Sequence, residues 1–261
     1  MKSKNYWLNS GFFTMMHRGI DFLVGFLGFM MLVRIYSPDL FGVWVLFITI
    51  TTIIEISRNG FLQNGLIKYL GSDSEQEGKI QLSSLQQNIA LTIVLMCLTY
   101  FLAPYAESKL NAPGLEALMR LHVLFSPFLI LHTHNLILMQ AKFNFRAYFY
   151  AGISKTVPFF LFISIIYINN FSIDLVQLGW LYHLCIILAL LSSQVQVRKF
   201  FRITWGWHRE WFVKLYSFGI YVFGTNLLSV ISTSMDKFLL GGLLSPVQVA
   251  MANSAGRVIN M

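Results

Sequence analysis

Charged side chains are scarce in this sequence of 261 residues, because Asp, Glu, Lys and Arg together make up only 11%, against about 25% in an ordinary soluble domain. Apolar residues make up 56%, and the mean hydropathy is +0.63. A chain of this composition cannot cover its surface with polar groups, which excludes an ordinary soluble enzyme. It would also collapse rather than stay disordered. The two cysteines, Cys97 and Cys185, each lie inside an apolar run, so no disulfide framework is expected.

Catalytic and cofactor-binding patterns are also missing. We find no nucleophile elbow, no phosphate-binding loop and no zinc-ligand spacing. His122, His132 and His134 fall within one apolar run. The two-residue spacing of the last pair puts them on different helix faces, which is poor for a shared metal. The sequence therefore predicts a protein that is not an enzyme and that has no metal site and no cofactor.

Apolar runs of the length of a spanning helix, about 20 residues, recur along the chain. Two more segments, Asn9–Tyr36 and Leu40–Ile67, are interrupted by charges but keep a long clean stretch. An eighth run begins at Ser245 and still continues at Met261. We therefore expect an all-α polytopic membrane protein with seven complete spans, and we expect this sequence to be an N-terminal fragment. The uninterrupted runs are Ser84–Ala106, Leu121–Ala141, Thr156–Ile173, Leu175–Val197 and Leu215–Met235.

Positive charges gather in alternate loops, and such a bias sets the orientation of membrane proteins. With the N-terminus in the cytoplasm, the inner segments hold eleven Lys and Arg residues and the outer segments hold four. Since topology explains the net charge of +8, we expect no nucleic-acid partner. The segment Arg198–Lys214 alternates basic and aromatic residues, and we interpret it as an interfacial linker. The inner cations are Lys2, Lys4, Lys68, Lys79, Lys142, Arg146, Arg198, Lys199, Arg202, Arg209 and Lys214, and the outer ones are Arg34, Lys109, Arg120 and Lys237.

Ionisable residues inside the expected spans are candidate functional residues, because a charge at the bilayer centre costs about 2.5–3.5 kcal/mol. In the first span, His17, Arg18 and Asp21 share a helix face. In the second span, Glu55 and Arg58 are three residues apart. If these spans are antiparallel neighbours, Arg18 is level with Glu55, and Asp21 is level with Arg58. The alternative to a functional role is a closed ion-pair cluster that locks the two helices together.

Three further charged residues lie at depth without an obvious partner. Lys155 and Arg257 have no acid within four residues, which suggests a solvated cavity that accepts an anion. The alternative for Lys155 is snorkelling to the interface. Asp236, near the outer end of the seventh span, either binds a coupling ion or forms a structural salt bridge. We do not expect it to pair with the adjacent Lys237, because neighbouring residues point to different faces.

The two ends of the sequence show a weak internal similarity. A shift of 208 residues places Gly11 on Gly219, and the pair Ser37 and Pro38 on Ser245 and Pro246. Each segment then reads as a glycine, an apolar helix, Ser-Pro and a second helix. Parallel repeats of this kind occur in transporters.

Three segments together resemble a known family. They are LVRIYSPDLFGVWVLF (Leu32–Phe47), SRNGFLQNGLIKYLG (Ser57–Gly71) and the long segment Phe218–Asn260, which ends in Ala-x-Arg-x-x-Asn. The chain resembles the polysaccharide flippases of the Wzx type, which export O-antigen and capsular polysaccharide and belong to the MATE-like multidrug/oligosaccharidyl-lipid/polysaccharide exporter superfamily.

The resemblance implies a MATE-like helical bundle. Residues 1–200 would form a six-helix lobe, residues 201–214 a cytoplasmic linker and residues 215–261 the start of the second lobe. It implies flipping of an undecaprenyl-diphosphate-linked oligosaccharide from the inner to the outer leaflet of the bacterial inner membrane. The mechanism would be alternating access through a cationic cavity, with a proton or sodium as coupling ion and polysaccharide-assembly enzymes as partners. The cavity cations would be Arg18, Arg58, Lys155 and Arg257, and the residues that tune the field or couple an ion would be Asp21, Glu55 and Asp236.

Three alternatives remain open at this point. A MATE-type exporter of small organic cations would need acids to dominate its cavity, whereas cations outnumber acids at depth here. A membrane glycosyltransferase or polymerase would need a large acidic outer loop, which is not visible. The third alternative is an inactive truncated fragment that transports nothing.

Overall fold

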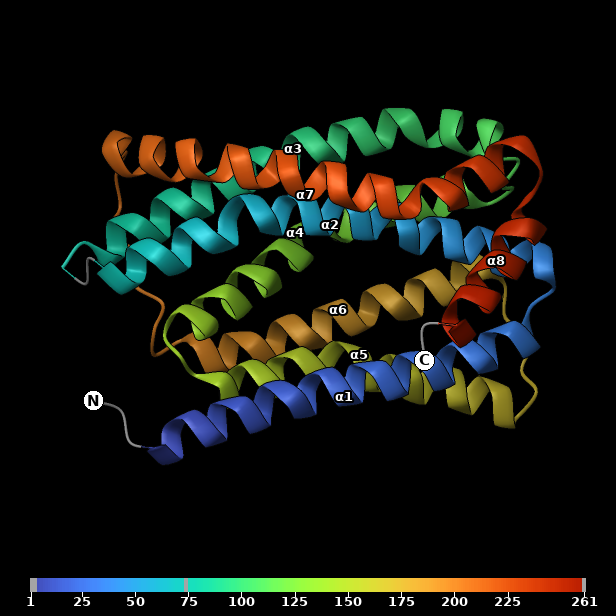
Figure 1. Ribbon diagram of the computed structural model, residues 1–261, viewed down its shortest axis with the longest axis horizontal. Helices are drawn as coiled ribbons and strands as arrows, with labels where there is room; N and C mark the ends of the chain where they lie inside the picture. The colour runs from blue at the N-terminus through green and yellow to red at the C-terminus, as the bar shows by residue number, and fades with distance from the viewer. Residues whose placement is uncertain (1–3, 73–74, 260–261) are drawn as a thin grey trace.

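The fold is all-α. A computed structural model describes residues 4–72 and 75–259, with side chains described at 11–71 and 75–255. The described residues form eight helices and no strands (Figure 1). These are α1 (Lys4–Ile35), α2 (Pro38–Ser72), α3 (Glu77–Lys109), α4 (Leu115–Ala141), α5 (Phe145–Ile168), α6 (Leu175–Val197), α7 (Arg209–Leu243) and α8 (Pro246–Ile259).

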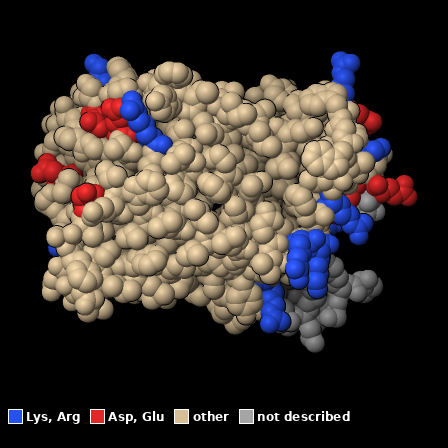
Figure 2. All heavy atoms as spheres, turned by 180° about the vertical axis from the view of Figure 1, so that it is seen from behind, with Lys and Arg blue, Asp and Glu red and all other residues tan. Residues whose placement is uncertain are grey.

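Six of these helices, α2 to α7, are long and apolar enough to cross a membrane. The expectation of a multi-pass membrane protein is therefore confirmed. The first expected span corresponds to α1, which has 32 residues but is not among the six. On the face seen in Figure 2, charged side chains gather toward the two ends of the molecule and leave a broad uncharged band between them. Such a band is what the hydrocarbon core of a bilayer requires.

The loops alternate between the two ends of the bundle, as the charge pattern predicts. The connections after α2, α4 and α6 lie at the same end as the N-terminus, and the connections after α1, α3, α5 and α7 lie at the opposite end (Figure 1). We call the first of these the basic end, because it carries Lys142, Arg146, Arg198, Lys199 and Arg202. Its position in the cytoplasm stays a prediction.

The helices pack in an order that the sequence does not show. α1 lies along α5 and makes few contacts with α2, while α4 is central and packs against α2, α3 and α6. α7 packs along α2 and also touches α3. Glycines allow this close packing, because a Cβ on Gly219 of α7 would overlap the carbonyl oxygen of Phe61 in α2. In the same way a Cβ on Gly42 of α2 would overlap the backbone of Pro246 in α8.

The last residues of the expected linker before α7 are helical. α6 ends at Val197 and α7 begins at Arg209, so residues 209–214 of the expected 201–214 linker are helical. Trp205 and Trp207 are exposed, as an interfacial segment requires, but Trp211 is 4% exposed. Trp211 packs against Tyr69 of α2, and its indole N–H donates to Gln76 Oε1 at 2.7 Å. These contacts extend α7 toward the basic end.

The Ser-Pro segments adopt the same local structure at both places. α2 begins at Pro38 and α8 begins at Pro246, each after a short turn that follows a long helix. Proline suits the first helical position because its missing N–H would have no partner there. The carbonyl of Ser37 accepts from Phe41 N at 2.9 Å, and the carbonyl of Ser245 accepts from Gln248 N at 3.2 Å. The helix–Ser-Pro–helix arrangement inferred from the repeat is therefore present in both copies.

Candidate functional site

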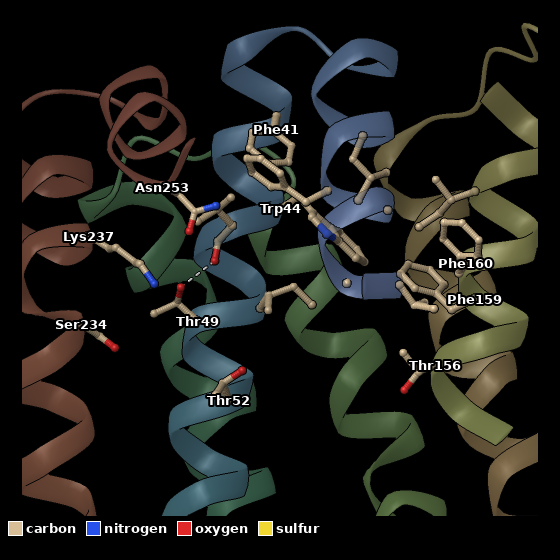
Figure 3. A pocket seen from close by; sticks show the side chains of 18 residues that line it. Phe41, Trp44, Thr49, Thr52, Thr156, Phe159, Phe160, Ser234, Lys237 and Asn253 are labelled. Atoms are coloured by element: carbon tan, nitrogen blue, oxygen red, sulfur yellow. Dashed lines mark hydrogen bonds between the residues drawn. The ribbon is translucent and has the colours of Figure 1, made fainter. Parts of the chain in front are cut away.

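A cavity of about 280 Å³ is lined by residues of α1, α2, α5, α7 and α8, with α2 between α7 and α8 on one side and α1 and α5 on the other (Figure 3). α1, α2, α5 and α7 each contribute positions at helical spacing, so that one face of each helix lines the cavity, and α8 contributes Asn253. The lining residues are Val24, Gly25, Gly28, Phe29, Leu32, Phe41, Trp44, Val45, Ile48, Thr49, Thr52, Thr156, Phe159, Phe160, Ile163, Ser234, Lys237 and Asn253. We call this space the central cavity.

Most polar groups of the central cavity lie on one wall. Figure 3 shows Ser234 and Lys237 of α7, Asn253 of α8 and the threonines Thr49 and Thr52 of α2 on the same side. Among the described lining residues, Lys237 is the one with a positively charged side chain. This wall therefore offers one positive charge together with hydroxyl and amide groups.

The opposite wall is aromatic and aliphatic. Trp44 of α2 stacks on Phe159 of α5 with ring centroids 6.1 Å apart. Tyr182 of α6 packs edge-on to Phe159, with centroids 5.3 Å apart. Behind this wall the ammonium group of Lys155 lies 4.9 Å from the centroid of the Tyr182 ring, within the range of a cation–π contact. Lys155 is therefore held behind the aromatic wall and does not line the central cavity.

Arg58 and Glu55 face a second, smaller cavity between α2, α3 and α4, which has a volume of about 10 Å³. Arg58 is 3% exposed, and its Nη2 donates to Thr133 Oγ1 of α4 at 3.0 Å. Its Nε is buried without a partner among the described residues. Arg58 therefore belongs to the interior of the first six helices rather than to the central cavity.

The ion pairs considered between the first two expected spans do not form in the described part of the chain. Neither Arg18 with Glu55 nor Asp21 with Arg58 is paired. The reason is that α1 packs on α5 and barely contacts α2. Asp21 instead pairs with His17 on its own helix, with Nδ1 and Oδ2 3.1 Å apart.

Arg18 is exposed on α1, close enough to Tyr148 of α5 for its charge to act on that residue. Asp236 is exposed on α7. The side chain of Arg257 lies outside the described residues.

The expected cationic cavity thus differs from the observed one. Arg18, Arg58 and Lys155 lie elsewhere, and Lys237 is the cavity cation that sequence reasoning did not select. Its position near the outer end of an expected span made it look like an interfacial charge. The available signal was its three-residue spacing from Ser234, which puts both side chains on one face of α7.

A family profile described as "Polysaccharide biosynthesis protein" matches residues 31–261. The chain belongs to the polysaccharide biosynthesis protein family. No curated protein and no solved structure matches the chain.

The part matched to the polysaccharide biosynthesis protein family includes most of the central cavity. The segment Leu32–Phe47, which carries the resemblance to flippases, supplies Leu32, Phe41, Trp44 and Val45 to the cavity lining. The α7 and α8 positions also fall inside the matched range. By contrast, Arg18 and Asp21 precede it. The family match therefore coincides with the central cavity better than with the charges of α1.

Proposed function

We propose that the protein exports polysaccharide by moving a lipid-linked oligosaccharide across the membrane through the central cavity, and that it acts as a transporter rather than an enzyme. The observation that supports this most directly is the division of the cavity into a polar wall with one cation and an aromatic, aliphatic wall. A diphosphate-linked glycan on a prenyl chain has the matching parts, namely an anionic diphosphate, many hydroxyl groups and an apolar tail.

Each wall would bind a different part of this substrate. Lys237 would pair with the diphosphate, and Thr49, Thr52, Ser234 and Asn253 would exchange hydrogen bonds with sugar hydroxyls. The wall around Trp44 would contact the apolar portion. The volume of about 280 Å³ lies just below the range of about 300–1,000 Å³ for small-molecule pockets, so the cavity would hold the head group rather than the whole substrate.

The membrane context completes the proposal. We place the protein in the bacterial inner membrane with its N-terminus in the cytoplasm, because short cytoplasmic loops are the ones enriched in Lys and Arg. The lipid carrier would be undecaprenyl diphosphate, and polysaccharide-assembly enzymes would supply and consume the substrate. Movement of α7 and α8 against α1 and α5 would open the central cavity to either leaflet in turn. A MATE-type exporter of organic cations is disfavoured by the lysine in the cavity.

Translocation by the full-length protein in lipid vesicles tests the proposal. The probe is a diphosphate-linked oligosaccharide on a prenyl chain, labelled so that its outer-leaflet fraction can be quenched or cleaved. Lys237→Gln should slow translocation about tenfold to a hundredfold at limiting substrate, because a hydrogen bond to a charged group contributes about 1.5–3 kcal/mol. Lys237→Arg should retain most of the rate, since it keeps the charge.

Two controls make the result specific. Lys109→Gln removes a cation at the same end of the molecule but outside the central cavity, and its rate should equal the wild-type rate. Thr52→Val keeps the shape and removes one hydroxyl from the polar wall, so its rate should fall less than that of Lys237→Gln. Equal rates for Lys237→Gln and the wild type would refute the role of the cavity, and absence of translocation by the wild type would refute the proposed function.

A further inference from the structure

The helix α3 buries polar side chains and exposes apolar ones, the reverse of a helix in a soluble protein. Eight of its eleven buried residues are polar, whereas its exposed positions are apolar, including Ile89, Ile93 and Val94. An exposed apolar face suits contact with lipid, but a buried polar face needs a different explanation, because burying polar groups without partners is costly. The polar buried residues are Glu77, Gln81, Ser83, Ser84, Gln87, Asn88, Thr92 and Thr99.

Several of these polar groups have no protein partner. Ser84 Oγ, Asn88 Oδ1 and Thr92 Oγ1 are buried with no hydrogen-bond partner among the described residues. Their spacing of four residues aligns them along one face of α3 over about 12 Å. Buried polar groups in native proteins are paired with protein or with ordered water. The three side chains would therefore take water as their partner, along a line between α3 and its neighbours.

This line connects the basic end of the molecule with the small cavity at Arg58. At the basic end it starts beneath the linker, where the Gln81 amide donates to the Phe200 carbonyl and accepts from Arg202 N, both at 2.9 Å. At its other end Thr92 lines the small cavity. The volume of about 10 Å³ is about that of one water. The polar and charged residues around it are Glu55, Arg58, Thr92, Thr99, His122 and Ser126.

His122, which lines this cavity, is hydrogen-bonded to a second buried histidine. Nδ1 of His122 lies 3.3 Å from Nε2 of His183 in α6, and Nδ1 of His183 lies 2.7 Å from the carbonyl oxygen of Gly179. A carbonyl can only accept, so Nδ1 of His183 carries the proton. The Nε2 of neutral His183 is then the acceptor, and Nδ1 of His122 is the donor. The nitrogen of the two histidines whose lone pair stays free to take up a proton is therefore Nε2 of His122.

The charged and titratable groups around the pair lie on α2, α4, α5 and α6, whereas α3, which also packs on α4, contributes the hydroxyl groups of Thr92 and Thr99. α2 contributes Glu55 and Arg58, α5 contributes Lys155, and α6 contributes Tyr182, while His132 lies further along α4. Among these, Glu55 is the carboxylate on the same small cavity as His122. Glu55 would therefore be the counter-charge of an added proton on the pair, against the opposing positive charges of Lys155 and Arg58.

We infer that the polar face of α3 is a hydrated proton path and that the His122–His183 pair at its end is a proton-binding site. A proton from water adds to Nε2 of His122, and the pair becomes a single imidazolium that still donates through Nδ1 to His183. Release returns the proton to water along the same line. The proton site would supply the coupling ion for the proposed translocation, and that coupling alone rests on the proposed function.

Solid-state NMR of the full chain in lipid bilayers, with ¹³C and ¹⁵N labels, tests the path and the site without any substrate. Magnetisation transferred from water should reach Asn88 and Thr92 faster than Ile89 and Ile93, their lipid-facing neighbours on the same helix. Equal or slower transfer to Asn88 and Thr92 would show that the α3 face is dry and would overturn the path.

The site is tested by the ¹⁵N signals of the histidine rings as the pH is lowered. The wild type should gain one imidazolium signature shared by His122 and His183. His122→Asn keeps a donor toward His183 but cannot take up the proton, so the signature should disappear. His134→Asn, the same change at a buried histidine of the same helix, should keep it. Neutral signals from both rings throughout the pH range in which the protein stays folded would overturn the site.

Coupling is tested by the vesicle translocation assay with and without a pH gradient. The gradient should accelerate the wild type and His134→Asn but not His122→Asn. If His122→Asn responds to the gradient like the wild type, coupling through this pair is refuted. If the wild type does not translocate at all, the proposed function fails, while the NMR results still decide the proton path and site.

Discussion

The contact between α2 and α7 depends on the absence of a side chain at Gly219, and Gly219→Ala should therefore destabilise the protein. A Cβ at this position would overlap the backbone carbonyl oxygen of Phe61 and lie 3.0 Å and 3.1 Å from two carbons of its ring. The carbonyl belongs to a helix and cannot rotate away, so the two helices must separate by about 1 Å to restore ordinary contact. Overpacking of this kind costs about 1–3 kcal/mol.

The measurement is the thermal unfolding midpoint of the purified protein in detergent. At about 2–4 °C per kcal/mol for a chain of this size, the midpoint of Gly219→Ala should fall by roughly 2–12 °C. Gly224→Ala is the matched control, because it lies five residues further along α7 and a Cβ there has nothing within 4 Å. Its midpoint should stay constant or rise slightly, since alanine favours helices over glycine. Equal midpoints for the two variants would refute the close α2–α7 packing.

Two further predictions concern the two ends of the molecule. Glu77→Gln removes the ion pair with Lys142, whose Nζ lies 2.8 Å from Glu77 Oε1. This change should lower the unfolding free energy by about 1.5–3 kcal/mol and the thermal midpoint with it. Glu210→Gln removes the exposed pair with Lys214 and should leave the midpoint unchanged. Burial and the Asp174 carboxylate raise the pKa of Tyr36 from 10.0 to about 12. The folded state therefore holds the phenol proton more tightly, so this contribution to stability is complete below pH about 10 and is lost as the pH rises to about 12. Midpoints measured across this range should fall less for Tyr36→Phe than for the wild type, and parallel curves would contradict the assignment.

The sequence predicts those features of the fold that depend on local rules. Run length and loop charge predict α2 to α7 and the alternation of their ends, because a bilayer constrains both. The Ser-Pro steps at Pro38 and Pro246 predict where α2 and α8 begin, since proline is favoured at a first helical position. The start of α7 at Arg209 was not predicted, because aromatic residues such as Trp211 suit an interface and a packed helix start equally well.

Features that depend on which helices are neighbours could not be predicted in this way. Their similar depth in the membrane made Arg18 and Glu55 possible partners, but they do not meet because α1 packs on α5 rather than on α2. The role proposed for Lys237 depends on which face of α7 meets the central cavity. Its spacing from Ser234 puts both side chains on one face but does not show what that face packs against. The His122–His183 pair joins residues 61 positions apart on two helices, and its sequence signal was only that His122 is buried in an apolar run.

The polar face of α3 also constrains how the protein is made. Gln87 donates to the carbonyl of Phe212 at 2.5 Å, and the two residues are 125 positions apart. At a synthesis rate of about 5–20 residues per second, α3 leaves the ribosome roughly 6–25 seconds before its partner in α7 exists. During that interval Gln87 and its neighbours must be shielded from lipid by α4, by water or by the insertion machinery. The rate of translation between the two helices thus becomes a determinant of correct assembly, and slowing it should raise the fraction of chains that are degraded before α7 is inserted.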